Sequence, residues 1–170
     1  MMRRGFTLVE MLTTVAGLVI LLGLMVSLAR HVRGREAEAL SRQVLASLDD
    51  ELKRRPEMEG LLKDVPPLLR AGEGGEEDEL QQAALRNNQE LVRVLHEKGD
   101  AALFRTLPVT LYDASTLRDA WGTPVVYMKS GAQNVGISPL GRYFFLSAGP
   151  DRRFGTVLDN LYSYERAWGR

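Results

Sequence analysis

Residues 6–29 read FTLVEMLTTVAGLVILLGLMVSLA, and this stretch decides how the chain is organised. Its single ionisable side chain is Glu10, and positions 11–29 carry no charged residue. As an α-helix rising about 1.5 Å per residue, the stretch is roughly 36 Å long, which exceeds a hydrocarbon core of about 30 Å. A soluble core helix would have a polar face, which residues 15–26 lack. The sequence therefore predicts a transmembrane helix over residues 6–29.

A secretory signal peptide is the alternative for the same stretch. Arg3 and Arg4 form a basic start, and residues 27–29 (SLA) fit a small-x-small cleavage site. The uncharged run exceeds the roughly 7–15 apolar residues of a signal peptide, which favours a helix that stays in the membrane. The flanking charges leave the orientation open, because residues 30–35 carry three arginines on the far side.

Glu10 needs an explanation, because a carboxylate among lipid tails costs about 2.5–3.5 kcal/mol. Two explanations compete. Residues 7–10 (TLVE) fit the S/T-x-x-E capping box, in which the glutamate accepts a hydrogen bond from a backbone amide at the helix start. Alternatively, if the chain is cut after Gly5, the carboxylate neutralises the new amine of Phe6 in a neighbouring subunit. The spacing alone does not separate the two.

The string RRGFTLVE at residues 3–10, followed by a long apolar helix, resembles the processing signal of type IV pilins and of type II secretion pseudopilins. This resemblance implies that a prepilin peptidase cuts between Gly5 and Phe6, that the Phe6 amine is methylated, and that Glu10 supports filament assembly. It also implies a single-pass inner-membrane protein, with residues 1–5 as a cytoplasmic leader and the C-terminal domain in the periplasm.

Residues 30–55 continue the helix with an amphipathic pattern. Apolar residues recur at helical spacing: Leu40, Val44, Leu45, Leu48 and Leu52. Pro56 then ends the run. We expect one continuous helix over residues 6–55, whose second half places this stripe against a soluble domain. The stripe is too short to indicate a coiled coil.

Residues 56–79 predict a flexible loop. They contain three prolines, and the stretch AGEGGEEDE at residues 71–79 combines glycines with acids, which is typical of a solvated and mobile segment. No Gly-Lys-Ser/Thr follows these glycines, so they do not indicate a phosphate-binding loop.

Residues 80–170 predict an α+β globular head. A helix is expected over residues 80–97, with Leu85, Val92 and Leu95 on one side. Three short strands are expected at residues 125–128, 142–147 and 161–164. Since so few antiparallel strands cannot stand alone, we expect them to pack on the amphipathic half of the long helix. Together with the resemblance, this implies a pilin-like α+β fold.

Two strings in the head resemble the major pseudopilin of type II secretion systems. Residues 119–124 (DAWGTP) match a D-P-W-G-N-P turn motif, with substitutions at Ala120 and Thr123. Residues 147–151 (SAGPD) match an S-x-G-x-D loop that follows a strand. These matches favour a secretion system over a pilus.

In that family the last loop binds calcium, and the resemblance therefore implies a structural calcium ion held by Asp151 and Asp159. A hard cation of this kind takes about six to eight oxygen ligands. Arg152 and Arg153 add positive charge beside Asp151. The alternative is that Asp151 starts a turn and pairs with an arginine, and that Asp159 caps the next element.

The composition argues against other function classes. The net charge of zero gives no electrostatic footprint for nucleic acid. The chain has no cysteine, and its two histidines, His31 and His96, stand outside any hydrolase or metalloprotease motif, so no enzyme is predicted. Asp113 with Asp119 forms a carboxylate pair in sequence, although aspartates are common in turns.

The resulting hypothesis is a structural subunit of a periplasmic pseudopilus that helps to export folded proteins. Its implied partners are prepilin peptidase, other pseudopilin subunits, the inner-membrane assembly platform and membrane lipid. Two alternatives stay open. One is a minor pilin of a type IV or DNA-uptake pilus. The other is a membrane-anchored binding domain, which would be favoured if the leader were removed at Ala29 or not removed at all.

Overall fold

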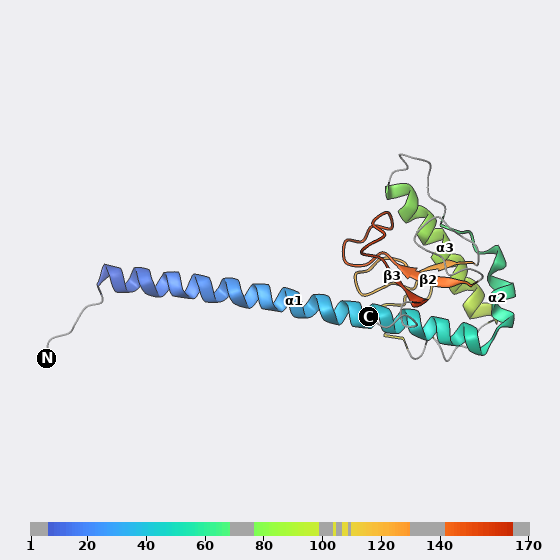
Figure 1. Ribbon diagram of the computed structural model, residues 1–170, viewed down its shortest axis with the longest axis horizontal. Helices are drawn as coiled ribbons and strands as arrows, with labels where there is room; N and C mark the ends of the chain where they lie inside the picture. The colour runs from blue at the N-terminus through green and yellow to red at the C-terminus, as the bar shows by residue number, and fades with distance from the viewer. Residues whose placement is uncertain are drawn as a thin grey trace. The chain divides into compact units, whose positions relative to one another are not determined.

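The computed structural model describes residues 7–68, 77–98, 104, 107–108, 110–129 and 142–164. This part of the chain is α+β, with a long N-terminal helix and one antiparallel sheet of strand order β1-β2-β3 (Figure 1). The elements are α1 (Leu8–Arg54), α2 (Glu57–Leu61), the 3₁₀ helix η1 (Leu62–Asp64), α3 (Glu77–Lys98), β1 (Val126–Met128), β2 (Phe144–Ser147) and β3 (Leu161–Tyr162). The chain divides into two units, residues 1–36 and 37–170.

Helix α1 changes its surroundings along its length. Its described residues up to position 36 are all exposed, whereas Val44, Leu45, Leu48 and Leu52 are buried in the second unit. The predicted amphipathic stripe is therefore confirmed. The helix ends at Arg54, shortly before the proline that was expected to stop it.

The sheet is buried on both faces, because alternate side chains of its strands enter two apolar clusters. Tyr127 and Phe145 belong to a cluster that also contains residues of α1 and α3. Val126 and Phe144 belong to a second cluster, which includes Phe154 from the C-terminal loop. Every residue of the three strands is consequently buried.

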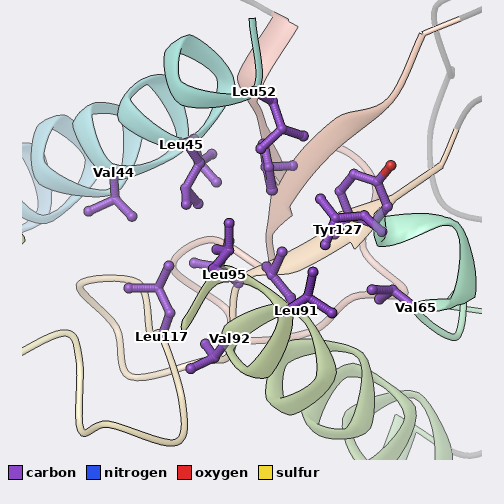
Figure 2. Close-up of a cluster of buried hydrophobic side chains, with 14 of the residues drawn as sticks. Val44, Leu45, Leu52, Val65, Leu91, Val92, Leu95, Leu117 and Tyr127 are labelled. Atoms are coloured by element: carbon purple, nitrogen blue, oxygen red, sulfur yellow. The ribbon is translucent and has the colours of Figure 1, made fainter. Parts of the chain in front are cut away.

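The first of these clusters joins both long helices to the sheet. Figure 2 shows Val44 and Leu45 of α1 pointing toward Leu91 and Leu95 of α3, with Tyr127 of β1 beside them. The prediction that the sheet packs on α1 was thus incomplete, because α3 also lies against β1. The sequence pattern gave no sign that the second helix would share this position.

Part of the predicted loop at residues 56–79 is helical. α2 and η1 occupy residues 57–64, and they bury Met58 and Leu62 in the first cluster together with Val65. The physical reason is the spacing of these apolar side chains, since residues four apart lie on one side of a helical turn. The prolines bound this compact segment and do not unfold it.

The acidic stretch at residues 71–79 also differs from the expected loop at its end. Its last three acids form the first turn of α3, where negative charge is stabilised near the helix N-terminus. Glu77 accepts a hydrogen bond through Oε1 from the backbone N–H of Phe154, at 2.9 Å. Residues 71–76 lie outside the described residues.

The buried face of α3 differs in part from the predicted one. Val92 and Leu95 are buried as expected, but Leu85 is 37% exposed. The buried face instead includes two polar residues, Asn87 and Asn88, both fully enclosed. Leu85 lies at the edge of this face, because at about 100° per residue it is one position away from the buried Ala84.

Asn87 takes the place of a neighbouring strand along β1, which is an edge strand of the sheet. Its Oδ1 accepts a hydrogen bond from the Tyr127 N–H at 2.8 Å, and its Nδ2 donates to the Tyr127 carbonyl at 2.7 Å. The same Nδ2 donates to the Pro66 carbonyl at 2.7 Å. The side-chain amide thereby satisfies backbone groups that an edge strand leaves open.

Asn88 makes similar hydrogen bonds to backbone groups that precede β1 in the chain. Its Oδ1 accepts from the Leu117 N–H at 2.9 Å, and its Nδ2 donates to the carbonyls of Leu117 and Val125 at 2.7 and 2.6 Å. The sequence pattern predicted no structural role for either asparagine. In the fold they fix the position of α3 against β1 and the segment that precedes it.

We predict that Asn88→Ala destabilises the head by about 3 kcal/mol, because it leaves buried N–H and C=O groups without partners. Gln82→Ala is the matched control, since Gln82 is an exposed amide on the same helix, and a change within about 0.5 kcal/mol is expected there. Urea unfolding of the full chain in detergent measures both. Equal stability of the two variants would contradict the role of Asn88.

Candidate functional site

The start of α1 is the candidate assembly site, and it contains a complete capping box. The Thr7 backbone N–H and the Thr7 hydroxyl both donate to Oε2 of Glu10, each at 3.0 Å. In return, the Glu10 N–H donates to the Thr7 hydroxyl oxygen at 3.2 Å. Gly5 and Phe6, the predicted cleavage residues, lie outside the described residues. The capping explanation of Glu10 is confirmed by this geometry.

The cap does not use up the Glu10 carboxylate. The hydrogen bonds described at this carboxylate end on Oε2, and among the described residues Oε1 makes none. The Thr7 N–H belongs to the peptide bond between Phe6 and Thr7, so a cut between Gly5 and Phe6 leaves it in place. Capping and an ion pair with a neighbouring amine are therefore compatible roles for one carboxylate.

The next turn of α1 satisfies its own hydroxyl groups. Thr13 and Thr14 donate through Oγ1 to the Glu10 carbonyl, at 3.0 and 2.7 Å. Such bonds to the preceding turn remove hydroxyl donors that hydrocarbon could not satisfy. These polar side chains thus suit a helix without water around it.

The segment that follows is long and apolar enough to span a membrane. Its most apolar 18 residues have a mean hydropathy of 2.4, and none of that window is buried. Leucine, isoleucine and valine side chains such as Leu18, Ile20 and Leu24 are more than half exposed. A core helix of a soluble protein would be covered, so this surface requires an apolar partner outside the described residues.

The two strings that resemble the major pseudopilin meet through one hydrogen bond. Asp119 begins the DAWGTP turn and accepts from the backbone N–H groups of Trp121 and Thr123, at 3.0 and 2.9 Å. Its Oδ2 also accepts from the Ser147 hydroxyl at 2.7 Å and from the Thr123 hydroxyl. Ser147 ends β2 and begins the SAGPD loop. Asp119 therefore holds the turn and the loop together.

The C-terminal loop closes on itself through its backbone. Gly149 has a positive φ of +71°, and a Cβ placed there would lie 2.0 Å from the Asp159 carbonyl oxygen. Asp151 accepts a hydrogen bond through Oδ1 from the Arg153 N–H at 2.9 Å, which is a turn-forming contact. The structure thus gives Asp151 the turn role that the sequence offered as the alternative to calcium.

The implied calcium site has few candidate side-chain ligands among the described residues. No three carboxylate, imidazole or thiol groups gather in the part of the chain that the structure describes, whereas calcium takes about six to eight oxygens. Asn160 contributes one buried Oδ1 that has no hydrogen-bond partner among the described residues, while its Nδ2 donates to the Phe154 carbonyl at 3.0 Å. Calcium binding at Asp151 and Asp159 stays a prediction of the resemblance.

The remaining polar candidates are engaged locally. Asp113 accepts hydrogen bonds from the hydroxyl and amide groups of Thr116 and Ser115, which lower the pKa of its carboxyl to about 2. It therefore serves its own turn, as Asp119 does. His96 stacks on Phe104 with ring centroids 4.4 Å apart and hydrogen-bonds to the Tyr112 hydroxyl. His31 is exposed on α1.

Comparisons with protein-family models, with curated proteins and with solved structures find no match to this chain.

We predict that Gly149→Ala destabilises the head far more than Gly122→Ala. Both glycines have a positive φ, +71° and +88°, which costs an alanine about 1–2 kcal/mol. A Cβ at Gly122 meets no atom within 4 Å, whereas one at Gly149 meets the Asp159 carbonyl. Displacing that backbone adds roughly 1–3 kcal/mol. Urea unfolding measures the free energy of unfolding of both variants. Equal losses of stability would contradict the close approach of Gly149 to the Asp159 carbonyl.

Proposed function

We propose that this chain is a structural subunit of the pilin-like class, a pseudopilin of a type II secretion system. Prepilin peptidase cuts it between Gly5 and Phe6, and the Phe6 amine is methylated. Residues 6–29 hold it in the inner membrane as a single span, with the C-terminal domain in the periplasm. The subunits assemble through these helices into a periplasmic filament that helps to export folded proteins.

The observation that carries this proposal is a charged helix cap at the beginning of an uncovered apolar helix. Glu10 is ordered by Thr7 and keeps its Oε1 without a bond to any described residue. An oriented carboxylate at the edge of a membrane span is costly unless it has a positive partner. The cleaved amine of Phe6 in a neighbouring subunit has the charge and the location that this carboxylate needs.

The exposed surface of α1 supports assembly by packing. Side chains of the apolar segment are exposed along it, so helices of neighbouring subunits can meet on more than one side. Close contact between helices in lipid depends on van der Waals packing and on small residues, and Gly17 and Gly23 leave open space beside the backbone. The mechanism is association, with no chemical turnover by this chain.

A minor pilin of a type IV or DNA-uptake pilus is the second candidate. A minor pilin would have the same features at the start of the helix as a pseudopilin. Only features of the head can therefore distinguish the two candidates. The hydrogen bond between Asp119 and Ser147 joins the DAWGTP and SAGPD strings in one local structure. Because both strings resemble the major pseudopilin, their linkage favours the secretion system.

Three variants separate the ion-pair role of Glu10 from its capping role. Glu10→Gln keeps an oxygen that can accept from Thr7 but removes the charge, Glu10→Ala removes both, and Thr7→Val removes the hydroxyl but keeps the charge. Losing one partner of a buried ion pair costs about 3–5 kcal/mol, on the order of a hundredfold or more in association. We expect both Glu10 variants to insert but not to assemble.

Cross-linking of the full chain in native membranes measures assembly, and resistance to alkaline extraction measures insertion. Thr7→Val should assemble at nearly the level of the unaltered chain, because its carboxylate remains. Normal assembly of Glu10→Gln would show that capping is sufficient, and the proposed ion pair would be wrong.

A further inference from the structure

The three arginines directly after the apolar segment differ from the other basic residues of α1. Within the part of the chain that the structure describes, Arg30, Arg33 and Arg35 are exposed and make no hydrogen bond or ion pair. Each basic residue later in α1 is paired with an acid on the same helix: Arg42 with Glu38, Lys53 with Asp49, and Arg54 with Glu51. Arg55, directly after the helix, also pairs with Glu51.

For Arg33 and Arg35, the absence of pairing is not caused by a lack of acids nearby. Glu36 lies three residues after Arg33, a spacing at which helical side chains can pair. No acidic residue lies between positions 11 and 35, so the arginines form a block of positive charge at the end of the uncharged run. Their charges are therefore available to a partner outside the chain.

The positions of the arginines match the depth of a lipid headgroup layer. If the hydrocarbon ends near residue 29, a rise of about 1.5 Å per residue places all three within roughly 9 Å of it. The headgroup region on each side is about 5–8 Å thick, and arginine side chains extend along the helix to reach it. The block thus spans this layer.

The arrangement around the helix favours lipids over a single protein partner. At about 100° per residue, Arg30 and Arg33 lie roughly 60° apart, and Arg35 lies about 140° from Arg30. A single protein partner approaches from one side, whereas lipids surround the helix. The guanidinium group also matches phosphate oxygens, with which it forms paired charge-assisted hydrogen bonds.

We propose that Arg30, Arg33 and Arg35 bind the phosphates of anionic lipids and thereby fix the depth of α1 in the membrane. This inference rests on the membrane insertion proposed above. Each arginine near a lipid surface contributes roughly a fivefold gain in association. The block also marks the junction at which residues 37–170 begin the second unit.

The test uses the full chain reconstituted in phosphatidylcholine vesicles that contain spin-labelled phosphatidylglycerol or spin-labelled phosphatidylcholine. The spectra report the fraction of each lipid that the protein immobilises, and their ratio gives the preference for the anionic lipid. We expect Arg30→Gln/Arg33→Gln/Arg35→Gln to reduce this preference several-fold. The control Arg42→Gln/Lys53→Gln/Arg54→Gln, which removes the same charge from the same helix, should leave it unchanged.

Two further arms make the result specific. Arg3→Gln/Arg4→Gln measures the contribution of the basic start, and inorganic phosphate tests for a site that takes free anions. The proposal is overturned if the junction variant keeps the full preference, if only the Arg3/Arg4 variant loses it, or if inorganic phosphate abolishes it at matched ionic strength. Alkaline extraction of the same samples measures membrane insertion separately. The lipid preference can therefore be interpreted even if the protein does not assemble into filaments.

Discussion

The uncovered apolar surface of α1 is the constraint on which the organisation of this protein depends. Residues 8–29 expose large aliphatic side chains, and fully burying one such side chain is worth about 1.5–3 kcal/mol. None of the described residues supplies that cover. A lipid bilayer can cover this surface, and so can the apolar helix of a neighbouring subunit. The bilayer can do so first and the neighbouring helix after assembly. The capped Glu10 and the unpaired arginines at the two ends of this surface are consistent with a segment placed at a defined depth.

The second half of the same helix is stabilised in a different way. Val44, Leu45 and Leu48 are buried in a cluster with α3 and the sheet, while Asn87 and Asn88 hydrogen-bond α3 to backbone groups of β1 and its preceding segment. Apolar packing positions α1 in this unit, and polar pairing positions α3. The head therefore has an ordered core of its own, independent of what surrounds the apolar segment.

The sequence predicted the features that depend on periodicity and on local chemistry. The long apolar helix, the stripe containing Val44 and Leu48, the end of α1 and the three strands are all present. The helical segment at residues 57–64 and the asparagine face of α3 were missed, because their stability comes from contacts with distant segments. Asn87 bonds to Tyr127, 40 residues away, and no local pattern reveals such a partner. The capping box, by contrast, was predicted from residues 7–10 (TLVE) alone.

The proposed assembly depends most directly on the cut between Gly5 and Phe6. The decisive measurement is the intact mass and the amino-terminal sequence of the protein recovered from native membranes. We expect a chain that begins at Phe6 and carries a methyl group on its amine. A chain that begins at Arg30 would contradict the proposed assembly, because cleavage there removes Glu10 and the apolar segment and leaves a secreted domain that cannot assemble through α1.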